Sequence, residues 1–205
     1  MDRFAVTGLV LAGGLGRRMG GVDKGLQLLR AEPMVAHVLS RLAPQVDAML
    51  INANQNADIY ASIGAAYDAR VVPDLIGGFA GPLAGLQAGL AASATPLVVT
   101  VPCDSPFLPP DLVARLRDAL HAAQAKIAVA KTGDQSHPVF ALVDVSVRDN
   151  LTAFLERGGR KIDAWYAALP TVEVAFDDEA DAFGNINTRE ELRTFETRSL
   201  TADDS

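Results

Sequence analysis

Short apolar runs of β-strand type alternate with helical patterns along the chain, and this alternation restricts its fold more than any other feature. Residues 6–11 form a continuous apolar run that is broken by Gly13-Gly14, and residues 97–101 form another that ends at Pro102. Continuous apolar runs are typical of strands covered on both faces. The pattern predicts an α/β protein: a three-layer α/β/α, Rossmann-like fold with a mostly parallel central sheet.

The predicted elements follow one another closely. Strands are expected at 6–11, 48–53, 70–72, 97–101, 127–130, 139–143 and 172–176. Helices are expected at 34–42, 57–63, 82–92, 111–123, 145–156 and 189–195, the last beginning after Thr188 as N-cap, with Glu191 completing a capping box. We find no internal repeat and no long linker, so residues 1–196 are predicted to form a single domain and 197–205 a disordered tail.

Composition excludes several classes of function. The 205 residues carry 25 acidic and 18 basic side chains, a net charge of −7, which argues against sequence-independent binding of nucleic acid. Cys103 is the only cysteine, so an internal disulfide is excluded and a reducing compartment is favoured. No apolar run reaches the ~18 residues of a membrane span. We expect a cytoplasmic protein.

A glycine-rich loop follows the first predicted strand. Residues 11–25 contain six glycines together with Arg17, Arg18 and Lys24. Glycines let backbone N–H groups approach phosphate oxygens, and Arg18 and Lys24 supply positive charge. The loop is neither a dinucleotide fingerprint, because Met19 stands at the third glycine position, nor a P-loop. Its pattern favours phosphate binding over a surface loop with incidental charges.

A second informative loop follows the strand that we expect to be central. Asp104 stands where a carboxylate could hold Mg²⁺, which prefers oxygen ligands and substrate phosphates. The alternative is a turn aspartate that caps its own backbone, aided by Ser105-Pro106. Cys103 has no His/Asn constellation to activate it, so we expect it to fill the end of the strand.

Polar residues also follow the second and third strands. Asn52-Ala53-Asn54 ends one, and Asp74 follows the other, before a glycine-rich segment at 77–85. Acceptors around Asp74 would suit the N–H donors of guanine, with turn capping as the alternative.

The histidines and one basic turn give weaker signals. His37, His121 and His137 have no zinc spacing, and His137-Pro138 begins a strand that is placed to line a site. The basic turn at 157–161 complements a helix end or contacts a second phosphorylated substrate.

Together these segments resemble a known family. Leu11-Ala12-Gly13-Gly14-x-Gly16-x-Arg18-Met19 followed by Lys24 is similar to the signature of nucleotidyltransferases with an α/β/α fold. An ordered set of further motifs, covering nearly the whole chain, resembles the molybdenum cofactor guanylyltransferase family. These motifs are residues 20–25, 52–54, 81–85, 102–107, 137–138 and 183–188.

The resemblance implies a reaction and roles for residues. The family transfers GMP from Mg·GTP to the terminal phosphate of molybdenum-molybdopterin, forming the guanine dinucleotide cofactor and pyrophosphate. By position, the GTP-binding residues are Leu11, Ala12, Gly13, Gly14, Lys24, Asn52, Asp74 and Asp104. Asp104 is the implied magnesium ligand. Asn185 and Asn187 match residues near the molybdopterin side of the family's site. Gly184 stands where many members of the family have a larger residue. Magnesium on Asp104, with Lys24 and Arg18, would offset the negative charge of the phosphates.

Other interpretations stay open from the residues alone. A sister nucleotidyltransferase would use CTP or a sugar-phosphate acceptor, and a non-catalytic protein would only carry nucleotide or cofactor. Retention of Arg18, Lys24 and Asp104 favours catalysis. We expect a monomer with transient contacts to cofactor-biosynthesis proteins or apo-molybdoenzymes, and no partner of nucleic acid or membrane type.

Overall fold

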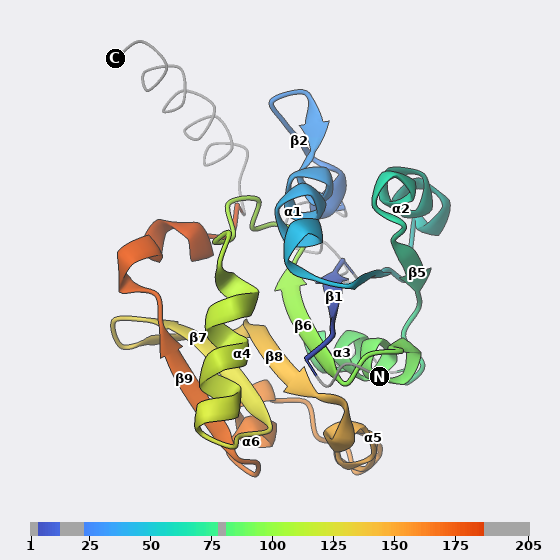
Figure 1. The fold of residues 1–205 in the computed structure, drawn as a ribbon. Coiled ribbons are helices and arrows are strands. Elements are labelled where there is room, and N and C mark those ends of the chain that lie inside the picture. Colours follow the sequence, from blue (N-terminus) through green and yellow to red (C-terminus); the bar gives the residue numbers. More distant parts are fainter. Residues whose placement is uncertain (1–3, 13–22, 78–80, 187–205) are drawn as a thin grey trace.

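A seven-stranded sheet forms the centre of the molecule (Figure 1). The structure is a computed structural model that describes residues 4–12, 23–77 and 81–186. The strand order is β5-β4-β1-β6-β8-β7-β9, and only β8 runs opposite to its neighbours. The strands are β1 (Val6–Leu11), β4 (Ala48–Asn52), β5 (Arg70–Val72), β6 (Leu97–Pro102), β7 (Ile127–Thr132), β8 (Gln135–Asp144) and β9 (Thr171–Ala175). The predicted mostly parallel sheet is confirmed.

Helices cover both faces of this sheet. They are α1 (Met34–Leu42), α2 (Ala57–Gly64), α3 (Pro82–Ala92), α4 (Leu112–Ala122), α5 (Arg148–Glu156) and α6 (Ile162–Tyr166). One apolar core joins the sheet to α1, α2 and α4, and a second core joins it to α3, α5 and α6. Figure 1 shows α1 and α4 in front of the sheet. The predicted three-layer α/β/α arrangement is therefore confirmed.

Successive side chains of the central strands point to opposite faces of the sheet, which explains how one sheet contributes to two cores. In β1, Val6 and Val10 belong to the core beneath α1, whereas Leu9 belongs to the core beneath α3. In β6, Val99 belongs to the core beneath α1, and Val98 belongs to the core beneath α3. Because successive side chains of a strand point to opposite faces, a strand buried on both sides must be apolar at nearly every position.

The carboxyl ends of four parallel strands lie in a row. Val72 is in register with Asn52, Asn52 with Leu11, and Leu11 with Pro102. Backbone hydrogen bonds continue the row past the strands, from Ala12 N to Asn52 O and from Cys103 N to Leu11 O. The loops after β1, β4, β5 and β6 therefore emerge side by side, where ligands of such sheets bind.

Some local predictions need correction. β8 begins at Gln135, so His137 lies inside the strand and does not begin it. The predicted helix at 145–156 is a 3₁₀ turn, Val145–Val147, followed by α5. The prediction omitted α6, the short β2–β3 hairpin (Leu28–Leu29 and Glu32–Pro33) and 3₁₀ segments, among them η2 (Lys24–Leu26) and η6 (Asp177–Phe183). The predicted helix at 189–195 and the tail at 197–205 lie outside the described residues.

Candidate active site

An ion pair joins the first loop to the loop after the central strand. Lys24 Nζ lies 3.0 Å from Asp104 Oδ2, and 80 residues separate the two positions in the sequence. The lysine side chain is 26% exposed and the aspartate side chain 11%, so both groups are reachable but partly shielded from water. The carboxylate that was expected either to hold a metal ion or to cap its own turn therefore faces a lysine from another segment.

The backbone around Asp104 is held from two sides. Cys103 N donates to Leu11 O at the end of β1, and Asp104 O accepts a hydrogen bond from Ile186 N. Ser105, which is fully buried, donates from Oγ to Asn185 Oδ1 at 2.6 Å. The loop after β6 is thus tied to the chain segment that carries Asn185, and the Asp104 carboxylate is directed toward Lys24.

Lys24 extends from a short turn that packs against α2. The turn is η2, with Asp23 at its N-cap. Tyr60 donates from its hydroxyl to Asp23 Oδ1 at 2.5 Å, and Asn56 Nδ2 donates to Asp23 Oδ2 at 3.0 Å. A Cβ at Gly25 would meet the Tyr60 hydroxyl and the Cys103 side chain, so this position accepts only glycine without rearrangement.

A network of amides and a carboxylate links the loops after β4 and β5. Asn52 Nδ2 donates to Asp74 Oδ1 at 2.9 Å, and Asn54 Nδ2 donates to Asp74 Oδ2 at 2.8 Å. In return Asp74 N donates to Asn54 Oδ1 at 2.9 Å. The predicted nucleotide residues Asn52 and Asp74 therefore lie together with Asn54. These contacts join two different loops, so they differ from the turn capping that was the alternative interpretation. Gly85 of α3 packs directly on Asn52 Oδ1 and Leu11.

A cavity of about 470 Å³ lies between the β7–β8 hairpin and the end of η6. It extends from Pro102, next to the loop of Asp104, to His137, Phe183 and Asn185. The His137 ring stacks on Phe183 with centroids 4.8 Å apart, and its Nε2 lies 2.7 Å from Thr132 Oγ1. Burial lowers the pKa of His137 below 6.5, which favours the neutral ring. The cavity presents aromatic faces and polar atoms, among them Asn185, which binds Ser105 in the loop after β6.

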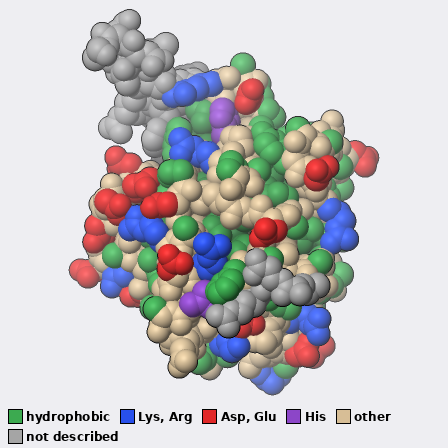
Figure 2. Space-filling model, in the orientation of Figure 1, with side chains coloured by type: hydrophobic (Ala, Val, Ile, Leu, Met, Phe, Trp, Pro, Cys, Tyr) green, Lys and Arg blue, Asp and Glu red, His purple; other side chains and the backbone are tan. Residues whose placement is uncertain are grey.

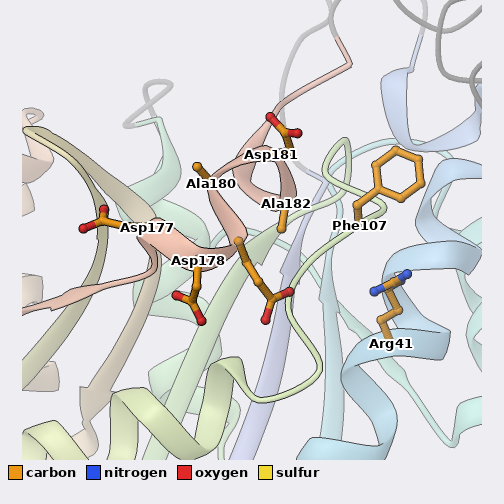
Figure 3. A pocket seen from close by; sticks show the side chains of 8 residues that line it. Arg41, Phe107, Asp177, Asp178, Ala180, Asp181 and Ala182 are labelled. Carbon is orange, nitrogen blue, oxygen red and sulfur yellow. The ribbon is translucent and has the colours of Figure 1, made fainter.

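A second cavity, of about 510 Å³, has an acidic wall (Figure 3). Arg41 and Phe107 face Asp178 and Asp181 across it. Figure 2 shows acidic side chains gathered over η6 at the left of the molecule. Arg115 already binds Asp178 through two hydrogen bonds of 2.9 and 3.0 Å. This acidic surface disfavours a polyphosphate.

Buried Cys103 has a structural role. Burial, with Asp104 and Asp23 nearby, raises the pKa of its thiol above the ordinary value. A thiol that stays protonated is a poor nucleophile, so the prediction that Cys103 fills the strand end agrees with the structure.

The basic turn at 157–161 serves the end of α5. Arg160 donates to Leu155 O at 2.8 Å, and Gly158, with φ of 86°, occupies the left-handed region just after the helix. These contacts match the helix-end interpretation of this turn.

The structure brings together only part of the predicted site. Leu11 and Ala12 lie at the end of β1, with Ala12 N bonded to Asn52 O. Asp104 lies in the loop after β6, where it contacts Lys24, and Asn185 contacts the same loop through Ser105. The predicted Gly13, Gly14, Arg18 and Asn187 lie outside the described residues.

Sequence reasoning missed Asp23 and Tyr60. Asp23 stands next to Lys24 in the quoted motif and could have been noticed there. Tyr60 gave no local signal, because a tyrosine on a predicted helix is usually a core residue.

These features define a class of protein: an α/β protein whose sheet edge carries a lysine–aspartate pair beside an amide–carboxylate network, an arrangement suited to nucleotide phosphates. The chain belongs to the family described as MobA-like NTP transferase domain, whose model matches residues 8–172.

Named relatives agree over nearly the whole chain. A molybdenum cofactor guanylyltransferase of Cupriavidus necator is 55% identical and covers 96% of this chain and 98% of its own length. A molybdenum cofactor guanylyltransferase of Burkholderia ambifaria is 54% identical, and the match covers 95% of this chain and 97% of the relative. The crystal structure of molybdopterin-guanine dinucleotide biosynthesis protein A from Archaeoglobus fulgidus has a TM-score of 0.76 at 25% identity, covering 95% and 99%.

The described part of the chain contains no helix with the length and apolar character needed to span a membrane.

Proposed function

We propose that this chain transfers GMP from GTP to the terminal phosphate of molybdenum-molybdopterin, forming the guanine dinucleotide cofactor and releasing pyrophosphate. The observation that carries the proposal is the contact of Lys24 with Asp104 at the carboxyl edge of the sheet. Support comes from relatives about 55% identical that are named molybdenum cofactor guanylyltransferase. We place the protein in the cytoplasm as a monomer that makes transient contacts with cofactor-biosynthesis proteins or apo-molybdoenzymes.

The reaction needs positioning and charge neutralisation more than a protein nucleophile. An oxygen of the molybdopterin phosphate attacks the α-phosphorus of GTP, a new P–O bond forms, and the bond to the β-phosphate oxygen breaks as pyrophosphate leaves. Both reactants are polyanions, so their approach is opposed by charge repulsion. Lys24 and Arg18 offset this repulsion, and Gly13 and Gly14 at the start of the loop after β1 would supply backbone amides to the phosphates.

The residues present fit a magnesium ion. Among the described residues no group of three or more His, Cys, Asp or Glu side chains could hold a metal. A single carboxylate, completed by substrate phosphates and water, is the usual protein contribution to Mg²⁺. Asp104 is the residue that would hold it, and the bound ion would supply charge stabilisation to the leaving pyrophosphate. An ion held by Asp104 would replace the contact with Lys24 and leave the lysine ammonium for the phosphates.

The nucleoside and the acceptor occupy opposite sides of this centre in the proposal. Asn52 and Asp74 lie on the β4–β5 side, where they contact the nucleoside. Asn185 lies on the β8 side, beside the cavity that reaches His137, and Asn187 follows two residues later. For in-line displacement the acceptor oxygen must attack the α-phosphorus opposite the leaving pyrophosphate.

The test is conversion of molybdenum-loaded molybdopterin with GTP, compared with CTP, with and without Mg²⁺. We expect pyrophosphate and a guanine dinucleotide product from GTP and Mg²⁺ only. Turnover with CTP would point to a cytidylyltransferase, and a sugar phosphate that replaced molybdopterin would point to another acceptor. Nucleotide binding without pyrophosphate release, even with acceptor present, would indicate a carrier protein.

A further inference from the structure

The position of the Lys24 ammonium depends on the short turn that carries it. A lysine ammonium sits on a flexible four-carbon stem, so its position depends on how firmly the backbone beneath it is held. Lys24 belongs to a three-residue 3₁₀ turn that has no long helix or strand of its own to anchor it. An electrostatic group contributes most to catalysis when it is already in place before the substrate arrives.

Tyr60 of α2 and Asn56, the N-cap of that helix, hold this turn through Asp23. The Tyr60 hydroxyl lies 2.5 Å from Asp23 Oδ1, and Asn56 Nδ2 lies 3.0 Å from Oδ2, so each carboxylate oxygen accepts one hydrogen bond. Asp23 O also accepts from Leu26 N, which closes the turn around Lys24. Gln27 N donates to Lys24 O as well, so two hydrogen bonds close the turn and two more join it to Tyr60 and Asn56.

Tyr60 is a rigid anchor for these contacts. Its side chain is fully buried between α2 and the sheet, and Gly25 of the turn lies directly against its hydroxyl. Burial raises the pKa of the phenol above its ordinary value, so the hydroxyl keeps its proton and remains a donor. A buried ring has little rotational freedom, and its hydroxyl therefore marks a fixed point for Asp23.

The same β4–α2 segment organises both sides of the candidate site. Asn52 and Asn54 at its start bind Asp74, and Asn56 and Tyr60 immediately after them bind Asp23. Residues 52–60 thus join the nucleoside-side network to the lysine turn.

We propose that Asp23, held by Tyr60 and Asn56, is a positioning residue that keeps Lys24 directed at the triphosphate. This inference rests on the proposed GTP-dependent transfer. Asp23 acts through the lysine, so its anchor should matter only while Lys24 is present.

A double-mutant cycle tests this inference. Tyr60→Phe removes only the hydroxyl, and Lys24→Ala removes the group that it is argued to position. We expect Tyr60→Phe to lower kcat/KM for GTP about tenfold in the wild-type background, the scale of one hydrogen bond to a charged group. In the Lys24→Ala background it should change kcat/KM less than about twofold, because the two residues act as a unit.

The controls separate positioning from folding. Tyr67→Phe removes a hydroxyl from a tyrosine that lines a different cavity, and it should leave kcat/KM unchanged. Thermal unfolding of every variant is measured in parallel. If Tyr60→Phe does not fold, Asn56→Gly replaces it in the cycle. Asn56 is exposed and contacts the other oxygen of Asp23, and glycine adopts its φ of 53° without strain.

The outcomes are distinct. Loss of activity in the wild-type background that vanishes without Lys24 supports the inference. Unchanged activity, or an equal loss in both backgrounds, overturns it while the proposed function stands. A wild-type protein that releases no pyrophosphate from GTP and molybdenum-molybdopterin overturns the proposed function, and the inference with it.

Discussion

Lys24 Nζ and Asp104 Oδ2 lie 3.0 Å apart at the carboxyl edge of the sheet, where the loops after β1 and β6 meet. The lysine lies close enough to offset the charge of the carboxylate. A triphosphate would compete for the lysine and leave the carboxylate to a metal ion. Substrate binding would therefore exchange one set of charge contacts for another. No charge would be left buried without a partner, so the desolvation cost of an isolated charge would be avoided.

Replacement of Asp104 tests the proposed metal anchor. Asp104→Ala should abolish transfer at saturating GTP and Mg²⁺, because the carboxylate that would hold the ion is gone. The measurement is initial pyrophosphate release with molybdenum-molybdopterin as acceptor. Asp178→Ala, which breaks a surface pair with Arg115, is the control and should keep full activity. Near wild-type turnover of Asp104→Ala would count against the assignment.

Replacement of Lys24 tests the phosphate site. Lys24→Ala should lower kcat/KM by ~10²-fold or more, the scale of losing one preorganised charge-stabilising group. Lys126→Ala serves as the control, because Lys126 forms an ion pair with Asp144 and neither residue belongs to the candidate site. If the Lys24 variant changed only the preference for guanine over other bases, its placement at the phosphates would be incorrect.

Two glycines of α3 provide a matched pair. A methyl group at Gly85 would overlap Asn52 Oδ1, and one at Gly89 would overlap Leu9 in the core. Gly85→Ala and Gly89→Ala should both lower the thermal midpoint, since overpacking costs about 1–3 kcal/mol. Only Gly85→Ala should also raise KM for GTP. Equal KM values in the two variants would separate Asn52 from nucleotide binding.

The Asp74 carboxylate holds two amides at the nucleoside side. Asp74→Ala should release Asn52 and Asn54 and raise KM for GTP about tenfold, the scale of one or two lost hydrogen bonds. Competition between GTP and CTP measures whether selectivity changes as well. Asp58→Ala, on an exposed position of α2, is the control. An unchanged KM would show that this network only ties loops together.

His137 predicts a pH dependence of stability. Burial lowers its pKa in the folded protein below 6.5, so the unfolded chain takes up the proton first as pH falls. The neutral ring therefore contributes stability above pH 6.5, and this contribution is lost as pH falls through the folded-state pKa.

The measurement is the thermal midpoint of the wild type and of His137→Gln across this pH range. The variant should show a shallower loss of stability on the acid side. Identical slopes for the wild type and His137→Gln would contradict the burial argument.

Most of the secondary structure could be predicted because its causes are local. The limits of α1 and α3 match the predicted ranges, since each has an apolar pattern that begins next to a proline. The short α6 escaped prediction because five residues carry too little periodicity to recognise. η6 was missed for a related reason: its acidic run lacks an apolar stripe, and it folds by packing Phe183 against its neighbours.

The sequence by itself determined the alternation of strands and helices, the glycine-rich loop and the residue types that suit phosphate and Mg²⁺. Those properties depend on side-chain periodicity and on chemistry carried by single residues. Only the tertiary structure decided that Lys24 meets Asp104, that Asn52 and Asn54 share Asp74, and that Tyr60 holds Asp23. Such contacts join residues 20 to 80 positions apart, and they form because the sheet places the ends of β5, β4, β1 and β6 in one row.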